Sequence, residues 1–300
     1  MSFEDRILRK IDNDKRAHDR AMRLDPRRES VEAIEKAHGR AHEVLQNPAY
    51  AVQATKFVDL YGKENVLADM RRVKEKQKEI EKNDTPSKIE TRRAAEVFEA
   101  IVLEQSRTRG WLGHNVAVFK TSRFDDYFNA CDLIAEWTDE RKDSRVLSLS
   151  VDVTFGARVV EKKLQEIRRR IDKGEMGTIK YFKSGDGTMR GERRMVPQIV
   201  VGADRRTVAN LAQLWLQNND RALATHPIQT ALTEEIREQL DLGEMYAVSR
   251  GQRAVADSYA RSRTTIEALM QEKQDVPLGG LEKDSVYSEI LSKTKHVFQI

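Results

Sequence analysis

A chain of 300 residues that is 34% charged and 39% hydrophobic can bury a sizeable core, but much of its helix must remain in water. Its single cysteine, Cys131, excludes an intramolecular disulfide framework and a cysteine-based zinc site. There is neither a run of 18 apolar residues nor an apolar signal-peptide segment, so we expect a cytoplasmic protein that does not enter a membrane.

Residues 1–88 are predicted to form an α-helical N-terminal extension. Apolar residues recur at helical spacing over residues 30–45, and a highly charged helix is predicted over residues 65–82. The Thr-Pro-Ser sequence at residues 85–87 marks the best candidate for a boundary. We favour an arm for packing or oligomerisation, and an arm that grips nucleic acid or a partner is the alternative.

The next helix is predicted over residues 89–107 and carries two glutamates of different character. Glu99 has apolar neighbours at i−4, i+3 and i+4, so its side chain borders the buried face of the helix. Glu96 has a more polar surrounding and is expected to be more exposed. If one of the two reaches a site on the following sheet, we expect it to be Glu99.

Three strands are predicted after this helix, over residues 115–120, 131–137 and 147–154. Side chains alternate between the two faces of a strand, which places Ile134 on the same face as the acids of the second strand, and in the third strand polar residues alternate with apolar ones. Asp132 and Glu136 share one face of the second strand, and Asp152 lies late on the third, beside small serines. Neighbouring strands lie about 4.8 Å apart, so these carboxylates are expected to cluster. Clustered carboxylate oxygens suit a hard ion such as Mg²⁺ or Mn²⁺.

A basic helix is predicted over residues 157–173. Lys163 lies beside its apolar face, so its side chain is placed to reach back toward the acidic strands. Residues 158–194 contain twelve Lys/Arg and six Asp/Glu, although the whole chain has a net charge of only +4. Excess positive charge beside clustered carboxylates suits a site that handles a phosphodiester. The candidate contacts to a nucleic-acid backbone are Arg168, Arg169, Arg170, Lys180 and Lys183.

The remainder of the chain is predicted to contain two more strands and several helices. The strands span residues 178–183 and 195–202, with a glycine-rich turn between them. Helices are predicted over residues 208–216, from residue 226 onward, and more weakly over residues 249–274. The sequence contains neither a GxxxxGK[ST] loop nor a nucleophile elbow, so ATP use and serine-hydrolase chemistry are not supported.

The order of elements from residue 89 to about residue 202 is helix, three strands, helix and further strands. With acids on the first helix, the second strand and the third strand, this order resembles the PD-(D/E)xK nuclease superfamily, which includes restriction endonucleases, Holliday-junction resolvases and repair nucleases. The resemblance covers a little over a third of the chain. It implies an α/β (α+β) fold with a mixed central β-sheet flanked by helices, a restriction-endonuclease-like core, and α-helical N-terminal and C-terminal extensions. The implied domains are an extension at 1–88, a nuclease domain at 89–248 and a helical tail at 249–300.

Carried over motif by motif, the resemblance assigns Glu99 to the glutamate of the first helix, Asp132 to the second motif and Asp152 to the third. It implies a Mg²⁺- or Mn²⁺-dependent nuclease that hydrolyses phosphodiester bonds in nucleic acid, with DNA favoured over RNA. Asp132 and Asp152 would bind one or two ions, and Glu99 would complete the site or bind a metal-bound water. The ion would polarise the phosphate and lower the pKa of the attacking water. Many nucleases of this fold act as dimers, which leaves a homodimer open.

The third motif departs from the pattern of the superfamily. It reads Asp152-Val153-Thr154, whereas the superfamily has a lysine at the last of these positions. Some members take this lysine from the next helix, and Lys163 is the candidate here to stabilise the developing negative charge. The missing lysine also fits a catalytically inactive nuclease-fold module that acts in nucleic-acid binding or assembly. In that case Asp152 would bond backbone N–H groups, and Thr154 would cap the following helix.

Overall fold

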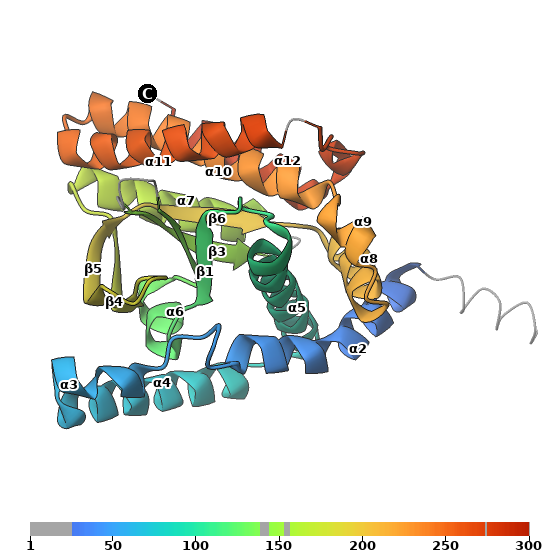
Figure 1. Ribbon diagram of the computed structural model, residues 1–300, viewed down its shortest axis with the longest axis horizontal. Coiled ribbons are helices and arrows are strands. Elements are labelled where there is room, and N and C mark those ends of the chain that lie inside the picture. The colour runs from blue at the N-terminus through green and yellow to red at the C-terminus, as the bar shows by residue number, and fades with distance from the viewer. Residues whose placement is uncertain (1–25, 139–143, 153–156, 274, 300) are drawn as a thin grey trace, which may run out of the picture.

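The computed structural model describes residues 26–138, 144–152, 157–273 and 275–299, with the side chains of residues 26–27, 144–145, 148–152 and 157–158 left outside the description. It shows a mixed α/β arrangement in which a small sheet lies between layers of helices (Figure 1). The predicted class, a mixed central sheet flanked by helices, is therefore confirmed. Every described helix is too short or too polar to cross a lipid bilayer.

The central sheet has four strands in the order β1-β2-β3-β6. They are β1 (Val116–Lys120), β2 (Leu133–Thr138), β3 (Ser144–Asp152) and β6 (Gln198–Gly202). The first three form an antiparallel meander, and β6 pairs with β3 in parallel. A separate hairpin is formed by β4 (Gly177–Lys183) and β5 (Arg190–Val196). Because β2 and β3 are antiparallel, the start of β2 and the end of β3 meet at the same edge of the sheet.

Helices cover both faces of this sheet. The described helices are α2 (Pro26–Gln46), η1 (Ala54–Phe57), α3 (Val58–Tyr61), α4 (Lys63–Lys82), α5 (Pro86–Arg109), α6 (Arg123–Asn129), α7 (Ala157–Asp172), α8 (Arg205–Leu216), α9 (Asp220–Ala224), α10 (Ile228–Ser249), α11 (Arg253–Glu272), η2 (Leu281–Lys283) and α12 (Ser285–Val297). In Figure 1, α7, α10, α11 and α12 lie on one side of the sheet, where α10 and α12 contact β6, whereas α5, α6, α2 and α4 lie on the other side. The sheet that carries the sequence motifs therefore lies between helices from the N-terminal part and helices from the C-terminal part of the described chain.

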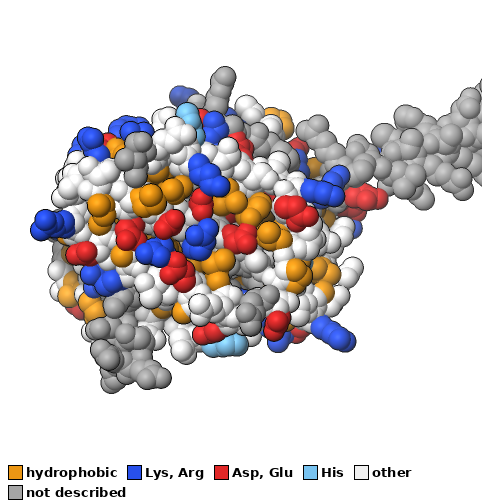
Figure 2. Space-filling view, turned by 90° about the horizontal axis from the view of Figure 1, so that it is seen from above, with side chains coloured by type: hydrophobic (Ala, Val, Ile, Leu, Met, Phe, Trp, Pro, Cys, Tyr) orange, Lys and Arg blue, Asp and Glu red, His pale blue; other side chains and the backbone are white. Residues whose placement is uncertain are grey.

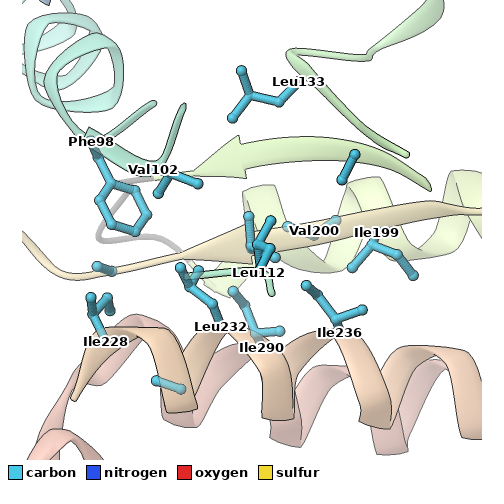
Figure 3. Close-up of a cluster of buried hydrophobic side chains, with 14 of the residues drawn as sticks. Phe98, Val102, Leu112, Leu133, Ile199, Val200, Ile228, Leu232, Ile236 and Ile290 are labelled. Carbon is cyan, nitrogen blue, oxygen red and sulfur yellow. The ribbon is translucent and has the colours of Figure 1, made fainter. Parts of the chain in front are cut away.

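The main core is built on both sides of β6 (Figure 3). Phe98 and Val102 of α5 lie on one side of this strand, and Leu232 and Ile236 of α10 lie on the other. All four side chains are at most 1% exposed, and each contributes about 1.5–3 kcal/mol of burial free energy. The same cluster includes buried side chains of α2 and α12, so both ends of the described chain pack into one core.

The local signals at the ends of α5 explain its length. Thr85 caps its first turn by accepting a hydrogen bond from the backbone N–H of Lys88, and Pro86 occupies the first helical position. Gly110 ends the helix in the left-handed conformation, with φ at 65°. The predicted helix over residues 89–107 is confirmed and is longer at both ends than its apolar pattern indicates.

The prediction of one strand over residues 195–202 is wrong. Residues up to Val196 belong to β5 and pair with β4, whereas Gln198 onward belongs to β6 and pairs with β3. Pro197 separates the two strands, because proline has no backbone N–H to donate to a ladder. Met195, with φ at 58°, adds a left-handed turn of the backbone at the same place. The chain therefore passes from the hairpin into the main sheet here.

A buried carboxyl group lies behind the main sheet. Glu235 of α10 is fully buried, and its Oε2 accepts a hydrogen bond of 3.0 Å from the backbone N–H of Gly202. Its Oε1 has no hydrogen-bond partner among the described residues. Burial raises the pKa of Glu235 well above its ordinary value, and the hydrogen bond from Gly202 opposes this shift only partly. Burial therefore favours the neutral form of this carboxyl group.

We predict that Glu235 makes the stability of the protein pH-dependent. A carboxyl whose pKa is raised on folding stabilises the folded state fully below its unfolded pKa, near 4.5. This contribution is lost as the pH rises toward the folded pKa, at no more than about 1.4 kcal/mol per pH unit. Glu235→Gln removes the titration, so its free energy of unfolding should fall less than that of the wild type between about pH 5 and pH 8. Urea denaturation at several pH values measures this, with Glu272→Gln, at an exposed position, as the control. Parallel pH profiles for wild type and Glu235→Gln would contradict the prediction.

Candidate active site

A buried lysine lies between two acids at the centre of the candidate site. The Nζ of Lys120, the last residue of β1, is 2.7 Å from Oε1 of Glu99 and 2.9 Å from Oδ2 of Asp126. The side chains of Glu99 and Lys120 are only 9% and 6% exposed. Glu99 projects from the buried face of α5, as its apolar neighbours predict, and Asp126 lies in the first turn of α6. Three elements that are separated in the sequence thus meet at one ammonium group.

Burial and neighbouring charges shift the pKa values of this cluster. Burial raises the pKa of Glu99 to about 8; Lys120 opposes this shift, while Asp132 and Asp126 add to it. Burial would lower the pKa of Lys120, but Asp126 and Glu99 outweigh that effect and raise it. Glu99 is more deeply buried than Asp126, the other acid that Lys120 contacts, so it takes up a proton more easily.

Asp132 and Lys163 line the same cavity as Glu99 and Lys120. The cavity has a volume of about 560 Å³, and Asp132 enters it from the residue before β2, whereas Lys163 enters it from α7. Asp132 is half-buried, and its backbone carbonyl accepts a hydrogen bond of 3.1 Å from the N–H of Thr121. The structure thus brings together three of the four predicted catalytic residues.

The fourth predicted residue, Asp152, is described only in its backbone. It is the last residue of β3 and stands opposite Gly202 of β6. Leu133 pairs with Leu149, so Asp152 lies at the edge of the sheet where Asp132 precedes β2. Its side chain lies outside the described residues, and Thr154 falls in the undescribed segment 153–156.

The N-terminal helices cover this cavity. His38 of α2 bonds to Glu96 of α5 at 2.6 Å, which gives Glu96 a partner outside the Glu99 cluster. At the corner between α4 and α5, Arg92 donates two hydrogen bonds to Asp84, at 2.9 and 2.7 Å. His38, residues of α4 such as Ile80, and Arg92 all line the cavity. The cavity is therefore bounded by α2, α4, α5, α6 and α7.

The fit of a metal ion depends on this set of acids. The acids at the cavity offer carboxylate oxygens, which suit Mg²⁺ or Mn²⁺. Among the described side chains, however, no group of three His, Cys, Asp or Glu residues comes close enough together to hold an ion. Glu99 faces the ammonium of Lys120, and the side chain of Asp152 lies outside the described residues. The set fits a metal ion only if the side chain of Asp152 completes it.

The predicted nucleic-acid contacts of α7 differ in their surroundings. Arg168 donates hydrogen bonds to the hydroxyl of Tyr246, at 2.9 Å, and to the carbonyl of Val297, at 2.7 Å. Its guanidinium also lies 4.8 Å from the ring centre of Tyr246. Arg169 is exposed and pairs with Glu166 at 3.1 Å, and Arg170 donates a hydrogen bond of 2.8 Å to Gln198. Arg168 therefore holds α7 against α10 and the end of α12, and Arg169 is the more accessible cation.

The two predicted lysines of β4 also differ. Lys180 forms an ion pair with Asp69 of α4, and its Nζ lies 4.9 Å from the ring centre of Phe124. Asp69 also accepts a hydrogen bond of 2.7 Å from the hydroxyl of Tyr181. Lys183, at the end of β4, is exposed. Lys180 is thus a link between the hairpin and the N-terminal helices, and Lys183 faces solvent.

We predict that Arg168 acts in stability rather than in nucleic-acid binding. Arg168→Met removes two hydrogen bonds and a cation–π contact, so the free energy of unfolding should fall by about 2 kcal/mol. Arg169→Met, one position along the helix, should change it by less than about 0.5 kcal/mol, because its ion pair is exposed. Urea denaturation of both variants measures the difference. Equal effects of the two substitutions would contradict the assignment.

The outer face formed by α10, α11 and α12 carries both signs of charge. Figure 2 shows Lys/Arg and Asp/Glu side chains interspersed among apolar ones on the face seen from above. Arg263 of α11, for example, pairs with Glu244 at 3.0 Å and with Glu267 at 2.7 Å. A surface of alternating sign does not favour a polyanion. A nucleic-acid surface is better sought at α7 and the cavity.

Lys120 and Asp126 are the site residues that sequence reasoning missed. Lys120 is visible as the last residue of a predicted strand, but nothing local to it indicates burial between two acids. Asp126 lies on α6, a helix that the apolar pattern does not predict. A signal for α6 exists, since Ser122 stands three residues before Asp125, as in a capping box. Ser122 does cap this helix, and its Oγ accepts a hydrogen bond from the N–H of Asp125 at 3.1 Å.

Comparisons with protein-family models, with curated proteins and with solved structures found no match to this chain. The function must therefore be argued from the geometry of the site.

Proposed function

We propose that this protein is a metal-dependent nuclease with a restriction-endonuclease-like core, of the PD-(D/E)xK type. The observation that carries the proposal is that Glu99, Asp132 and Lys163 line one cavity, although they come from three separate elements. The sequence assigns roles to these residues from the order of elements alone, independently of the cavity that they line.

The order and pairing of the elements add support. The helix α5 is followed by the antiparallel strands β1, β2 and β3, by helix α7, and by β6 in parallel with β3. The strand predicted directly after the second helix, over residues 178–183, is β4, and it pairs with β5 outside the main sheet, so β6 takes the place beside β3. The acids occupy the edge of the sheet where β2 begins and β3 ends.

The proposed division of labour follows from the charges. Asp132 and Asp152 would hold the ion, which when bound polarises a phosphate and lowers the pKa of its water. Lys163 faces the same cavity and would stabilise negative charge that develops on the phosphate. Glu99 and Asp126 hold the ammonium of Lys120 in place at the floor of the cavity.

A second candidate is a catalytically inactive nuclease-fold module that binds nucleic acid or acts in assembly. It is favoured by the pairing of Glu99 with Lys120, which makes this glutamate unavailable to an ion, and by the Thr154 of the third motif. Both candidates predict binding of nucleic acid, and only the first predicts cleavage.

The test is cleavage of single-stranded and double-stranded DNA and RNA by the purified protein with Mg²⁺, with Mn²⁺ or with EDTA. The proposal expects cleavage that requires the ion and is lost in Asp152→Asn. Folded wild-type protein that binds these substrates and cleaves none of them would instead establish the inactive module. Circular dichroism of both proteins confirms that each is folded.

A further inference from the structure

We propose that the substrate is single-stranded nucleic acid, and that the strand lies in a basic groove along α7 and enters the covered cavity past Lys163. This inference rests on the proposed function, because it names the substrate of that same site. The groove has a volume of about 340 Å³ and is separate from the cavity that holds Glu99 and Asp132. Lys163 is the residue that lines both.

The groove combines an apolar floor with a cationic rim. Ile167, Ile199 and Val200 contribute buried side chains to the floor. The rim carries the cations Lys162, Lys163, Arg169 and Arg170, with Glu166 as the acid among them. Such a surface is complementary to a chain that has apolar base faces and a regularly spaced negative charge. A free phosphate or a purely apolar ligand would use only one of these two features.

The helical spacing explains why the rim is continuous. Lys162, Glu166 and Arg169 recur at i, i+4 and i+7 and form one stripe on α7, and Lys163, Ile167 and Arg170 form the next stripe. The side chains of Lys162 and Arg169 are exposed, so they can turn toward a bound phosphate. Lys163 and Arg170, which are half-buried, edge the apolar floor.

The covering helices exclude a duplex from the cavity. Its volume of about 560 Å³ is that of a pocket for a small ligand, so stacked base pairs do not fit inside it. The cover is fastened at several points. Asp69 of α4 accepts the Tyr181 hydroxyl at 2.7 Å, and Asp84 accepts two bonds from Arg92. A thin, unpaired strand can reach Asp132 beneath this cover, and a base-paired one cannot.

The test measures binding without catalysis. Fluorescence anisotropy in EDTA compares a labelled single strand, as DNA and as RNA, with the corresponding blunt duplex. We expect the wild type to bind a single strand at least tenfold more tightly than the duplex. Lys162→Gln/Arg169→Gln should weaken single-strand binding about tenfold and should flatten its dependence on salt between about 50 and 200 mM. The control Arg253→Gln/Arg261→Gln removes the same charge from exposed positions of α11 and should bind as the wild type does.

The outcomes separate this inference from the proposed function. Equal affinity for single strand and duplex, or equal losses in the two double variants, would overturn the inference. Metal-dependent cleavage of duplex as fast as of single strand would overturn it too, while the nuclease function would stand. Selective single-strand binding that needs Lys162 and Arg169, with no cleavage under any condition, would support the groove and would refute the nuclease function.

Discussion

Substituting Asp132 by asparagine is expected to lower the rate of metal-dependent cleavage at least about 100-fold. Mutating a residue that only hydrogen-bonds to a metal ligand typically costs about 10–100-fold in activity, and removing the ligand itself should cost more. Asparagine keeps the size of the side chain and removes its negative charge. The fold should be retained, since Asp132 is only half-buried and its backbone carbonyl still accepts the bond from Thr121. Initial rates at saturating Mn²⁺ for wild type and variant measure the effect.

The matched control is Glu96→Gln. Glu96 also lines the cavity, but it bonds to His38 rather than belonging to the Glu99 cluster. Glutamine can still hydrogen-bond to that histidine, so cleavage should stay within about threefold of the wild-type rate. A loss in Glu96→Gln as large as that in Asp132→Asn would mean that the acids act through the charge of the whole cavity. The specific role of Asp132 would then be wrong.

Replacing Lys120 by methionine is expected to cause the largest loss of stability. The substitution leaves Glu99 and Asp126 without the cation between them, in a place that is nearly closed to water. Removing one partner of a buried ion pair costs about 3–5 kcal/mol. Urea denaturation near neutral pH should show a fall in the free energy of unfolding within this range. A change below about 0.5 kcal/mol, as at a surface site, would contradict the proposed pairing.

A double-mutant cycle separates this pairing from lost packing. Above its pKa of about 8, Glu99 carries the buried charge that Lys120→Met leaves uncompensated, and Glu99→Gln removes that charge. At about pH 9 the double variant should therefore be more stable than the two single effects predict by addition. We expect a coupling energy of about 1–2 kcal/mol between the two positions. Strict additivity would show that Lys120 stabilises the fold through its methylene groups and Asp126 alone.

Much of the fold can be predicted from local patterns. The alternation of polar and apolar residues predicts β3, and the apolar neighbours of Glu99 predict its burial. The comparison of the two glutamates is also confirmed, since the Glu96 side chain is 28% exposed and that of Glu99 is 9% exposed. These features follow from spacing along one element, which the sequence displays directly.

Other features depend on contacts between distant residues. Strand β5 carries mostly charged residues and is stabilised by its pairing with β4, so no apolar alternation reveals it. The pairing of Lys120 with Glu99 joins positions 21 residues apart, on β1 and α5, and needs the packing of α6 as well. Likewise, the covering of the cavity by α2 and α4 cannot be predicted from the charged pattern of residues 65–82. The contacts of Arg168 with Tyr246 and Val297 could not be predicted either, because both partners lie far along the chain.

The central claim is that the acidic edge of the sheet is a divalent-metal site. Titration of the protein with Mn²⁺, followed by electron paramagnetic resonance of the free ion, tests it most directly. The account predicts one or two bound ions in the wild type, and weaker binding in both Asp132→Asn and Asp152→Asn but not in Glu96→Gln. Binding should also tighten as the pH rises toward 8, where Glu99, with a pKa raised to about 8, loses its proton and adds negative charge to the site. Folded wild-type protein that binds no Mn²⁺, or that binds it equally in all three variants, would contradict the account.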